Sequence, residues 1–203
     1  MKVLMEKEAE DFLSKNGFPV VEAALFSDEK QAYAYAKKLK FPVVLKISGK
    51  LHKSDLNGVR VNVREEDFLN EFDNLKRITK KVMVQKYIDG KQVILGIKKD
   101  QTFGHALLFG MGGIFVEALK DVSFRVCPVE KKDIDEMVTE IEGYQILAGI
   151  RGEKPVNFNE IKNILLKLCK LSRKHKNIEE LDINPLIVNH KEAKVVDARI
   201  VFS

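Results

Sequence analysis

Residues 181–188 read LDINPLIV, and residues 194–202 read KVVDARIVF. Both stretches are rich in branched apolar residues and a short polar segment separates them, so they predict a closing β-hairpin. Asp182 and Asn184 are two apart on one strand and therefore share a face. Asp197 falls on the partner strand, within cross-strand reach.

Burying these three polar side chains inside apolar strands costs free energy unless they are paired. Mg²⁺ is usually held by oxygen ligands from the protein with nucleotide phosphates completing the shell. Asp182, Asn184 and Asp197 therefore predict a magnesium site on the hairpin. The alternative is that they are edge residues, hydrogen-bonded to the backbone or to Arg199.

Helices and strands alternate along the rest of the chain, but most strand connections are short polar turns, which favours an α+β fold. The helices are predicted over residues 6–16, 28–39, 65–80, 131–141 and 157–174. The further strands are predicted over residues 20–26, 43–47, 58–63, 82–88, 92–98, 105–109 and 122–126. In the third helix the residues expected to face inward are Phe68, Leu69, Phe72 and Leu75. We expect two lobes, the first over about 1–84 and the second over about 89–203, joined by a hinge over about 85–88.

Composition excludes several classes of function. With 203 residues, 45% of them hydrophobic, the chain can bury a sizeable core. It has no Trp, and its net charge of +5 is spread along the chain, so we expect no nucleic-acid partner. No apolar stretch is long enough to span a membrane, so we expect a cytoplasmic protein. Cys127 and Cys169 lack metal-ligand spacing, and we expect both to be reduced thiols.

Lys46 lies inside the otherwise apolar stretch 43–47. An unpaired ammonium there is costly, so a functional Lys46 would meet a phosphate in a cleft between lobes. A lysine on an edge strand that faces water explains the pattern equally well.

The loop that follows places His52 between Lys50 and Lys53. Neighbouring ammonium groups favour the neutral, nucleophilic imidazole, and lysines balance the charge of a phosphoryl group. The plainer interpretation is a surface loop with an incidental histidine. Residues 110–113 (GMGG) could cradle an anion through backbone amides, but the Lys-Ser/Thr of a P-loop is missing, and a tight turn explains them better.

Residues 51–55 (LHKSD), 109–117 (FGMGGIFVE) and 119–125 (LKDVSFR) form an ordered set of blocks with the closing hairpin. This set resembles the ATP-grasp β subunits of ADP-forming acetate–CoA ligases, which belong to the succinyl-CoA synthetase superfamily. The resemblance covers nearly the whole chain. It implies an ATP-grasp fold of two lobes with the nucleotide cleft between them.

The resemblance also implies an activity, the conversion of acyl-CoA, ADP and phosphate into the acid, ATP and CoA. His52 matches the histidine that takes the phosphoryl group from a phosphohistidine on the α subunit and passes it to ADP. Asp182 matches an acidic position near that phosphohistidine. Asn184 and Asp197 match the Mg²⁺ ligands, and Lys46 matches the lysine on the nucleotide phosphates.

The hinge that holds adenine in this family matches residues 85–88, which are Gln85, Lys86, Tyr87 and Ile88. The implied partner is an α subunit with the CoA-binding and phosphohistidine domains, in an α2β2 assembly. Alternatives are a related ligase for another acyl group and a regulatory nucleotide-binding ATP-grasp domain without catalysis. His52, Asn184 and Asp197 together favour the enzyme.

The chain departs from the family pattern at three positions. Gln92 replaces a Glu that normally faces the nucleotide, which removes one negative charge and bears on nucleotide affinity. The turn at 100–101 reads Asp-Gln where the family has Asp-Pro, and Asn57 replaces a glycine. None of these changes affects Lys46 or the predicted metal ligands.

Overall fold

The computed structural model describes residues 1–49, 57–113 and 121–203, which form two compact units. The larger unit comprises Met1–Val20 and Asp89–Ser203, and the smaller comprises Val21–Ile88. Residues 1–20 were expected in the first lobe, but they belong to the larger unit. The reason is strand β1 (Lys2–Met5), which pairs antiparallel with β11 (Ala198–Phe202), the last strand of the chain. Four residues are too few to reveal such a strand by alternation.

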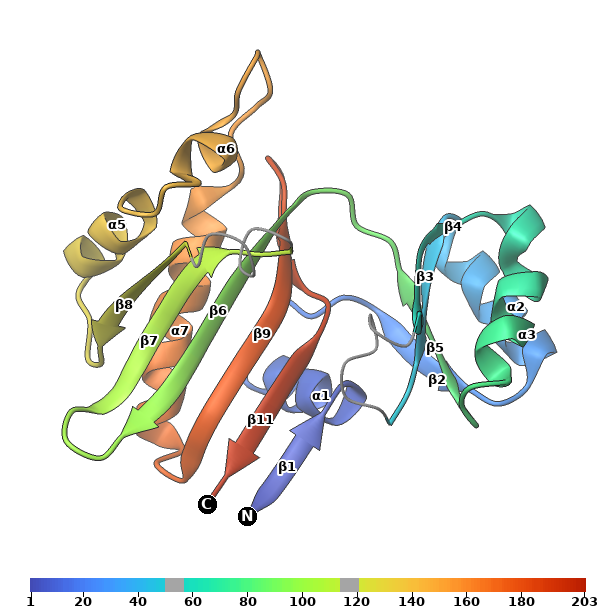
Figure 1. Ribbon diagram of the computed structural model, residues 1–203, viewed down its shortest axis with the longest axis horizontal. Helices are drawn as coiled ribbons and strands as arrows, with labels where there is room; N and C mark the ends of the chain where they lie inside the picture. The colour runs from blue at the N-terminus through green and yellow to red at the C-terminus, as the bar shows by residue number, and fades with distance from the viewer. Residues whose placement is uncertain (50–56, 114–120) are drawn as a thin grey trace. The chain divides into compact units, whose positions relative to one another are not determined.

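The smaller unit holds an antiparallel sheet in the order β2-β5-β3-β4. Its strands are β2 (Ala23–Phe26), β3 (Val43–Ile47), β4 (Val59–Val63) and β5 (Val82–Lys86). Helices α2 (Glu29–Leu39) and α3 (Phe68–Lys76) cover one face, and a 3-10 turn (Glu65–Asp67) precedes α3 (Figure 1). The Asp28 carboxylate caps α2 by accepting the N–H of Gln31 at 2.9 Å.

The core of the smaller unit lies between these helices and the sheet. Phe68, Phe72 and Leu75 are buried there, as the helical periodicity predicts. Leu69 was also expected inside, but it is 47% exposed. It directly follows Phe68, and the helix rotates about 100° per residue, which carries its side chain away from the sheet.

The larger unit holds a sheet whose described strands run in the order β1-β11-β9-β6-β7-β8, with β10 paired to β9. The bounds of the remaining strands are β6 (Lys91–Asp100), β7 (Gly104–Met111), β8 (Val122–Val126), β9 (Ile178–Val188) and β10 (Ala193–Val195). The strands at 82–88, 92–98 and 105–109 were expected to form one antiparallel meander, but β5 belongs to the smaller sheet. The observed meander is β6-β7-β8. The expected last strand is interrupted at residues 196–197, which separate β10 from β11.

In the described part of the larger unit, four helices cover one face of this sheet. They are α1 (Lys7–Lys15), α5 (Lys131–Thr139), α6 (Tyr144–Ala148) and α7 (Phe158–Lys174). All four contribute to one hydrophobic core, and α7 runs behind the strands in Figure 1. The short α6 has too few residues to show a period and was not predicted. We call the opposite side of this sheet its outer face. No helix of the described residues is long and apolar enough to cross a membrane.

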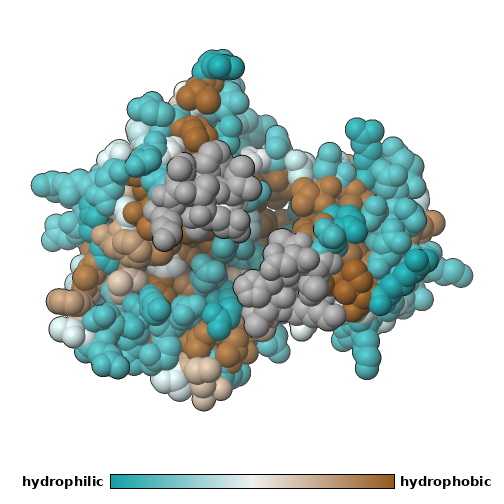
Figure 2. Space-filling model, in the orientation of Figure 1, coloured by the Kyte–Doolittle hydropathy of each residue, from teal (hydrophilic) through white to brown (hydrophobic). Residues whose placement is uncertain are grey.

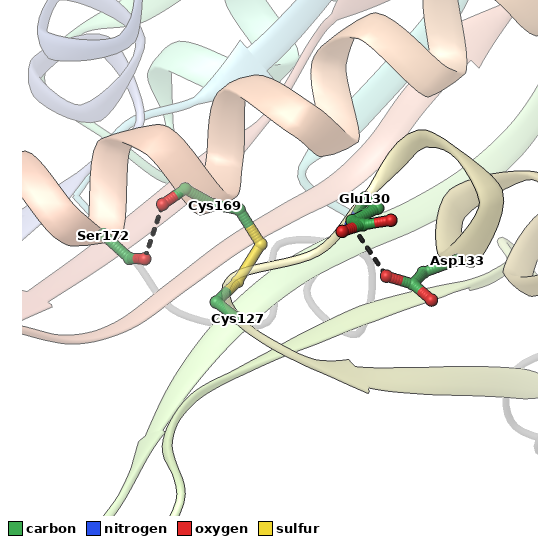
Figure 3. The surroundings of a disulfide bond; sticks show 5 residues. All are labelled: Cys127, Glu130, Asp133, Cys169 and Ser172. Carbon is green, nitrogen blue, oxygen red and sulfur yellow. Dashed lines mark hydrogen bonds between the residues drawn. A yellow bond between two sulfur atoms is a disulfide. The ribbon is translucent and has the colours of Figure 1, made fainter.

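A disulfide joins Cys127, just after β8, to Cys169 of α7 (Figure 3). The expectation of two reduced thiols was therefore wrong. The two Cα atoms are 5.7 Å apart, within the span of a disulfide. The residues are 42 apart in sequence, so spacing alone did not reveal the pair.

Candidate functional site

The closing strands bring two of the predicted metal ligands together. Asn184 lies in β9, and Asp197 lies in the break between β10 and β11. The backbone N–H of Asn184 donates to the carbonyl oxygen of Asp197 at 3.2 Å. The Asn184 side chain is exposed and that of Asp197 is half-buried, so solvent reaches both. The interruption of the last strand therefore places an amide and a carboxylate side by side at the surface.

Asp182 is directly opposite Arg199 of β11 in the register of the two strands. The pKa of the Asp182 carboxyl is raised to about 6, mainly by burial and also by the negative charges of Glu180 and Asp197. Arg199 acts in the opposite direction. Its guanidinium donates to Glu180 at 2.8 Å, so the two acids share one cation.

Gly96 of β6 faces Asp182 from the other side. A Cβ at this position would lie 2.9 Å from the carbonyl oxygen of Leu181, so a larger residue would force the strands apart. It would also lie 3.9 Å from a carboxylate oxygen of Asp182. The missing side chain leaves space beside Asp182 on the outer face.

The donor set on these strands fits Mg²⁺. Asn184 and Asp197 offer an amide and a carboxylate oxygen, which are hard ligands that suit this ion. Among the described residues, no group of three or more His, Cys, Asp or Glu side chains could hold a metal by itself. Mg²⁺ commonly takes one or two carboxylates and completes its shell with substrate phosphates and water.

In the smaller unit, Lys46 lies in β3 between β5 and β4, so it is not on an edge strand. It is only 6% exposed, and its cross-strand partners are Val59 and Met83. Val43, Leu45 and Ile47 point into the core, so alternation places Lys46 on the face away from α2 and α3. The interpretation of Lys46 as an edge-strand lysine facing water is therefore wrong.

The predicted adenine-binding residues follow at the end of the same sheet. Gln85 is 1% exposed in β5, where it pairs with Ala23 and Val44. Lys86 ends β5 and is exposed, and Tyr87 and Ile88 are half-buried. Ile88 is the last residue of the smaller unit. The structure thus holds Gln85 firmly in a strand and leaves Lys86 accessible.

Gln92 of β6 contacts a segment that sequence reasoning did not link to it. Its carbonyl oxygen accepts the N–H of Gly112 at 2.8 Å. A Cβ on Gly113 would lie 3.2 Å from the side-chain oxygen of Gln92, and Gly113 has a φ of 66°. Glycines at 112–113 are therefore needed for close approach to Gln92, which is a reason for the glycine pattern besides anion binding.

His52 lies outside the described residues, as do Lys50, Lys53 and residues 114–120. Sequence reasoning also missed the role of Gly96 beside Asp182 and the ion pair between Arg199 and Glu180. A glycine inside an apolar strand was the available signal for a close backbone approach. The ion pair had no signal, because it depends on the register of two strands.

The profile of the ATP-grasp domain family matches residues 1–202. The β subunit of ADP-forming acetate–CoA ligase I from Pyrococcus furiosus is 39% identical, with 98% of this chain and 91% of that protein covered. The chain belongs to the ATP-grasp family of ADP-forming acetate–CoA ligase β subunits. This confirms the fold class and the family expected from the sequence.

Two further relatives show how such chains are organised. ADP-forming acetate–CoA ligase I of Archaeoglobus fulgidus is 40% identical, and the match covers 91% of this chain but 30% of that longer protein. A solved structure of acetyl-coenzyme A synthetase 1 from Ca. Korarchaeum cryptofilum superposes with a TM-score of 0.86 at 38% identity, covering 100% of this chain and 93% of that one. That structure is a complex with coenzyme A and Mg-AMPPCP, and its phosphohistidine segment points towards the nucleotide binding site.

Proposed function

We propose that this chain is the nucleotide-binding β subunit of an ADP-forming acyl-CoA synthetase. With its partner it would catalyse the reaction of acyl-CoA, ADP and phosphate to the acid, ATP and CoA. The observation that carries the proposal is the cluster of Asp182, Asn184 and Asp197, which the register of β9, β10 and β11 assembles on an accessible sheet face. The 39% identity to a β subunit over nearly the whole chain supports it.

In this proposal each candidate residue has a role towards the nucleotide or its metal ion. Lys46 neutralises phosphate charge, and residues 85–88 hold the adenine ring. Asn184 and Asp197 hold Mg²⁺, which would neutralise the phosphate oxygens of ADP when bound. Gln92 faces the nucleotide as a neutral residue, which lowers repulsion towards the phosphates compared with a glutamate. Phosphoryl transfer needs such positioning and charge neutralisation more than covalent help.

The transfer itself moves a phosphoryl group between nitrogen and oxygen. A terminal oxygen of ADP attacks phosphorus, the P–N bond of a phosphohistidine breaks, and the imidazole leaves with the electron pair. His52 is the proposed carrier in this chain, because a histidine can hold the group covalently between two sites. Asp182 supplies a carboxyl group that can accept an imidazole N–H and so fix the tautomer of the ring.

The partner in this proposal is a separate α subunit that binds CoA and carries its own phosphohistidine, in an α2β2 assembly. The chain spans 91% of a relative named as a β subunit and 30% of a longer acetate–CoA ligase. We also propose a cytoplasmic location. The Cys127–Cys169 disulfide is unusual there, since disulfides are rare in the cytosol outside hyperthermophiles.

The test uses the chain together with its co-expressed α subunit. ATP formation from acetyl-CoA, ADP and phosphate is measured for the wild type, Asn184→Ala, Lys46→Met and His52→Asn. Each substitution is expected to lower turnover at least about 100-fold, the range lost when a preorganised charge-stabilising group is removed. Asn70→Ala, an exposed residue of α3, is the matched control and should retain full turnover.

Calorimetric titration with Mg·ADP separates binding from chemistry. Asn184→Ala and Lys46→Met should weaken Mg·ADP binding, whereas His52→Asn should leave it intact. A wild-type chain that binds Mg·ADP but forms no ATP with the α subunit would instead be a regulatory nucleotide-binding domain. Full turnover in His52→Asn would refute only the carrier role of His52 and leave the rest of the proposal standing.

A further inference from the structure

Five residues lie in one row across the outer face of the larger sheet, because each is the register partner of the next. From β11 to β8 these are Arg199, Asp182, Gly96, Leu108 and Phe124. Directly opposed residues of antiparallel strands point to the same face. The row changes character at Gly96, from charged residues on one side to apolar residues on the other.

The apolar end of the row belongs to a larger surface. Phe124 is 55% exposed and Val126 is 49% exposed, although both are large and apolar. Their partners on β7 are Leu108 and Ala106, which are half-buried. We call Ala106, Leu108, Phe124 and Val126 the apolar shelf. Figure 2 shows tan and brown side chains over β8 and the adjoining part of β7.

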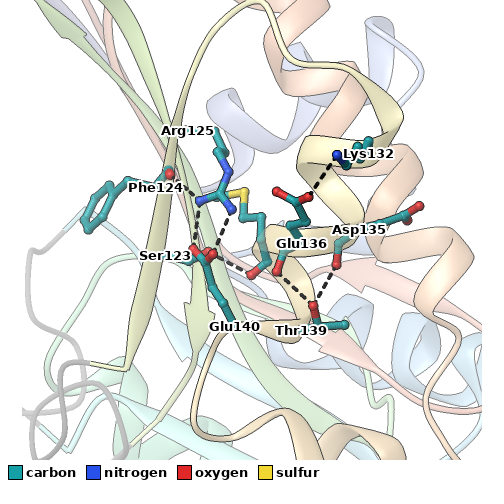
Figure 4. A network of polar contacts seen from close by, with 9 residues as sticks. Ser123, Phe124, Arg125, Lys132, Asp135, Glu136, Thr139 and Glu140 are labelled. Atoms are coloured by element: carbon teal, nitrogen blue, oxygen red, sulfur yellow. Dashed lines mark hydrogen bonds and ion pairs between the residues drawn. The ribbon is translucent and has the colours of Figure 1, made fainter.

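The shelf is a side-chain surface and not a place for an added strand. Strand β8 is the last in the sheet order, so its far edge lacks a neighbouring strand among the described residues. Arg125 covers this edge. Its guanidinium donates to the carbonyl oxygen of Phe124 at 2.8 Å and is held by the Glu140 carboxylate at 2.8 and 2.7 Å. In Figure 4 the Phe124 ring points away from this network, and a charged group on an edge opposes strand pairing.

We propose that the apolar shelf is the docking surface for the segment of the α subunit that carries the phosphohistidine. The inference rests on the proposed function and adds to it the surface that guides the segment. Strands are spaced about 4.8 Å apart, so Phe124 is about 14 Å from Asp182 along the row. An extended peptide covers that span with four or five residues.

Two observations favour this occupant. The shelf is continuous with Asp182 through Gly96, which contributes no side chain to the row between Leu108 and Asp182. A segment anchored on the shelf by apolar side chains would therefore present a histidine at Asp182. In addition, a relative of 38% identity is described with a phosphohistidine segment that points towards its nucleotide binding site. The occupant is thus an extended peptide with apolar side chains next to its histidine.

The experiment compares the double variant Phe124→Thr/Val126→Thr with wild type in complex with the α subunit. Threonine keeps strand propensity and removes apolar area. Val61→Thr is the matched control, because Val61 is 62% exposed on a strand of the smaller unit. Three quantities are measured: affinity for the α subunit, the α-subunit concentration that half-saturates ATP formation, and affinity of the chain alone for Mg·ADP.

The double variant should raise the half-saturating α-subunit concentration at least tenfold while Mg·ADP affinity stays within twofold of wild type. Val61→Thr should match wild type in all three measurements. A double variant with unchanged α-subunit affinity and half-saturation would overturn the shelf as a docking surface. So would a loss of self-association without a change towards the α subunit, which would assign the shelf to a second copy of this chain. If the wild-type chain with its α subunit forms no ATP, the proposed function is refuted. This result differs from the two outcomes for the double variant.

Discussion

The two sheets of this protein place their candidate site residues on the same kind of face but expose them to solvent to different extents. Each sheet has helices on one face and the polar candidates on the other. In the smaller unit Lys46 and Gln85 are 6% and 1% exposed, whereas in the larger unit Asn184 is exposed and Asp182 half-buried. A fixed ammonium can be built permanently into a strand, while ligands for an ion that arrives with its substrate must stay accessible. The difference therefore follows from what each group is proposed to hold.

The units also differ in what stabilises them. The smaller unit has a cluster of aromatic rings. The centroid of the Phe68 ring lies 5.7 to 5.9 Å from the ring centroids of Tyr33, Phe41 and Phe72. The larger unit has the Cys127–Cys169 disulfide, which ties the end of β8 to α7. One unit relies on packing within a local core and the other adds a covalent link. Substitutions can test the ring cluster and the disulfide separately.

The largest effect is expected for Phe68→Ala in the smaller unit. Phe68 is fully buried and contacts three other rings, so its removal should cost about 3 to 5 kcal/mol of unfolding free energy. Hydrogen exchange should show the loss of protection in residues 21–88 first. The control Phe103→Ala, at a side chain that is 68% exposed, should change stability by less than about 0.5 kcal/mol. Equal losses in both variants would contradict a ring-based core.

Breaking the disulfide should have the next largest effect, in the larger unit. The link closes a loop of 42 residues, so Cys127→Ser or Cys169→Ser should cost about 2 to 4 kcal/mol, measured by denaturant unfolding. A reductant should lower the stability of the wild type to that of the variants and leave the variants unchanged. Two thiols that alkylate freely in the native, unreduced protein would show that the link does not form.

Asp182→Asn is expected to stabilise the metal-free protein at alkaline pH. The folded-state pKa is raised to about 6, so the wild type loses stability as pH rises from about 4 through about 6, where this buried carboxyl ionises. The advantage of the variant should therefore grow by about 2 to 3 kcal/mol between pH 4 and pH 8. Unfolding is measured in the presence of a chelator.

Asp100 provides a control, because its pKa is shifted in the opposite direction to that of Asp182. Backbone N–H groups of Phe103 and Thr102 hold the pKa of this carboxyl below its usual value. The Asp100 carboxylate therefore contributes stability above its unfolded pKa and loses it as pH falls. Asp100→Asn should be less stable than wild type at pH 8 and should approach it in acid. The same pH trend in both variants would contradict a specific effect of burial at Asp182.

The smallest effect is expected for surface ion pairs, and it should be equal in the two units. Arg125 donates to Glu140 in the larger unit, and Arg60 to Glu71 at 2.7 Å in the smaller one. A double-mutant cycle is made for each pair, with Glu140→Gln or Glu71→Gln as the acid variant. Each should give a coupling below about 1 kcal/mol, because solvent reaches these partly exposed side chains and screens their charges. A coupling of several kcal/mol in one unit alone would add a third difference between them.

Most elements of the fold could be predicted from the sequence, because long stretches show a clear period. The strand at residues 122–126 and the helix at 157–174 were located to within a residue. The helix α6 and strand β1 were missed, since five and four residues carry no readable period. The expected start of the second lobe at residue 89 agrees with the structure, whereas the place of residues 1–20 depended on β1 and was missed along with that strand.

The sequence by itself determined which residues were candidates, because charged groups such as Lys46 and Asp182 are out of place in apolar strands. It could not determine partners, since these depend on which strands are neighbours and in what register. Only the tertiary structure showed that Arg199 is opposite Asp182, that Gly96 leaves room beside it, and that Cys127 meets Cys169. A pattern along the chain records burial and local period, whereas distances between remote residues are set by packing.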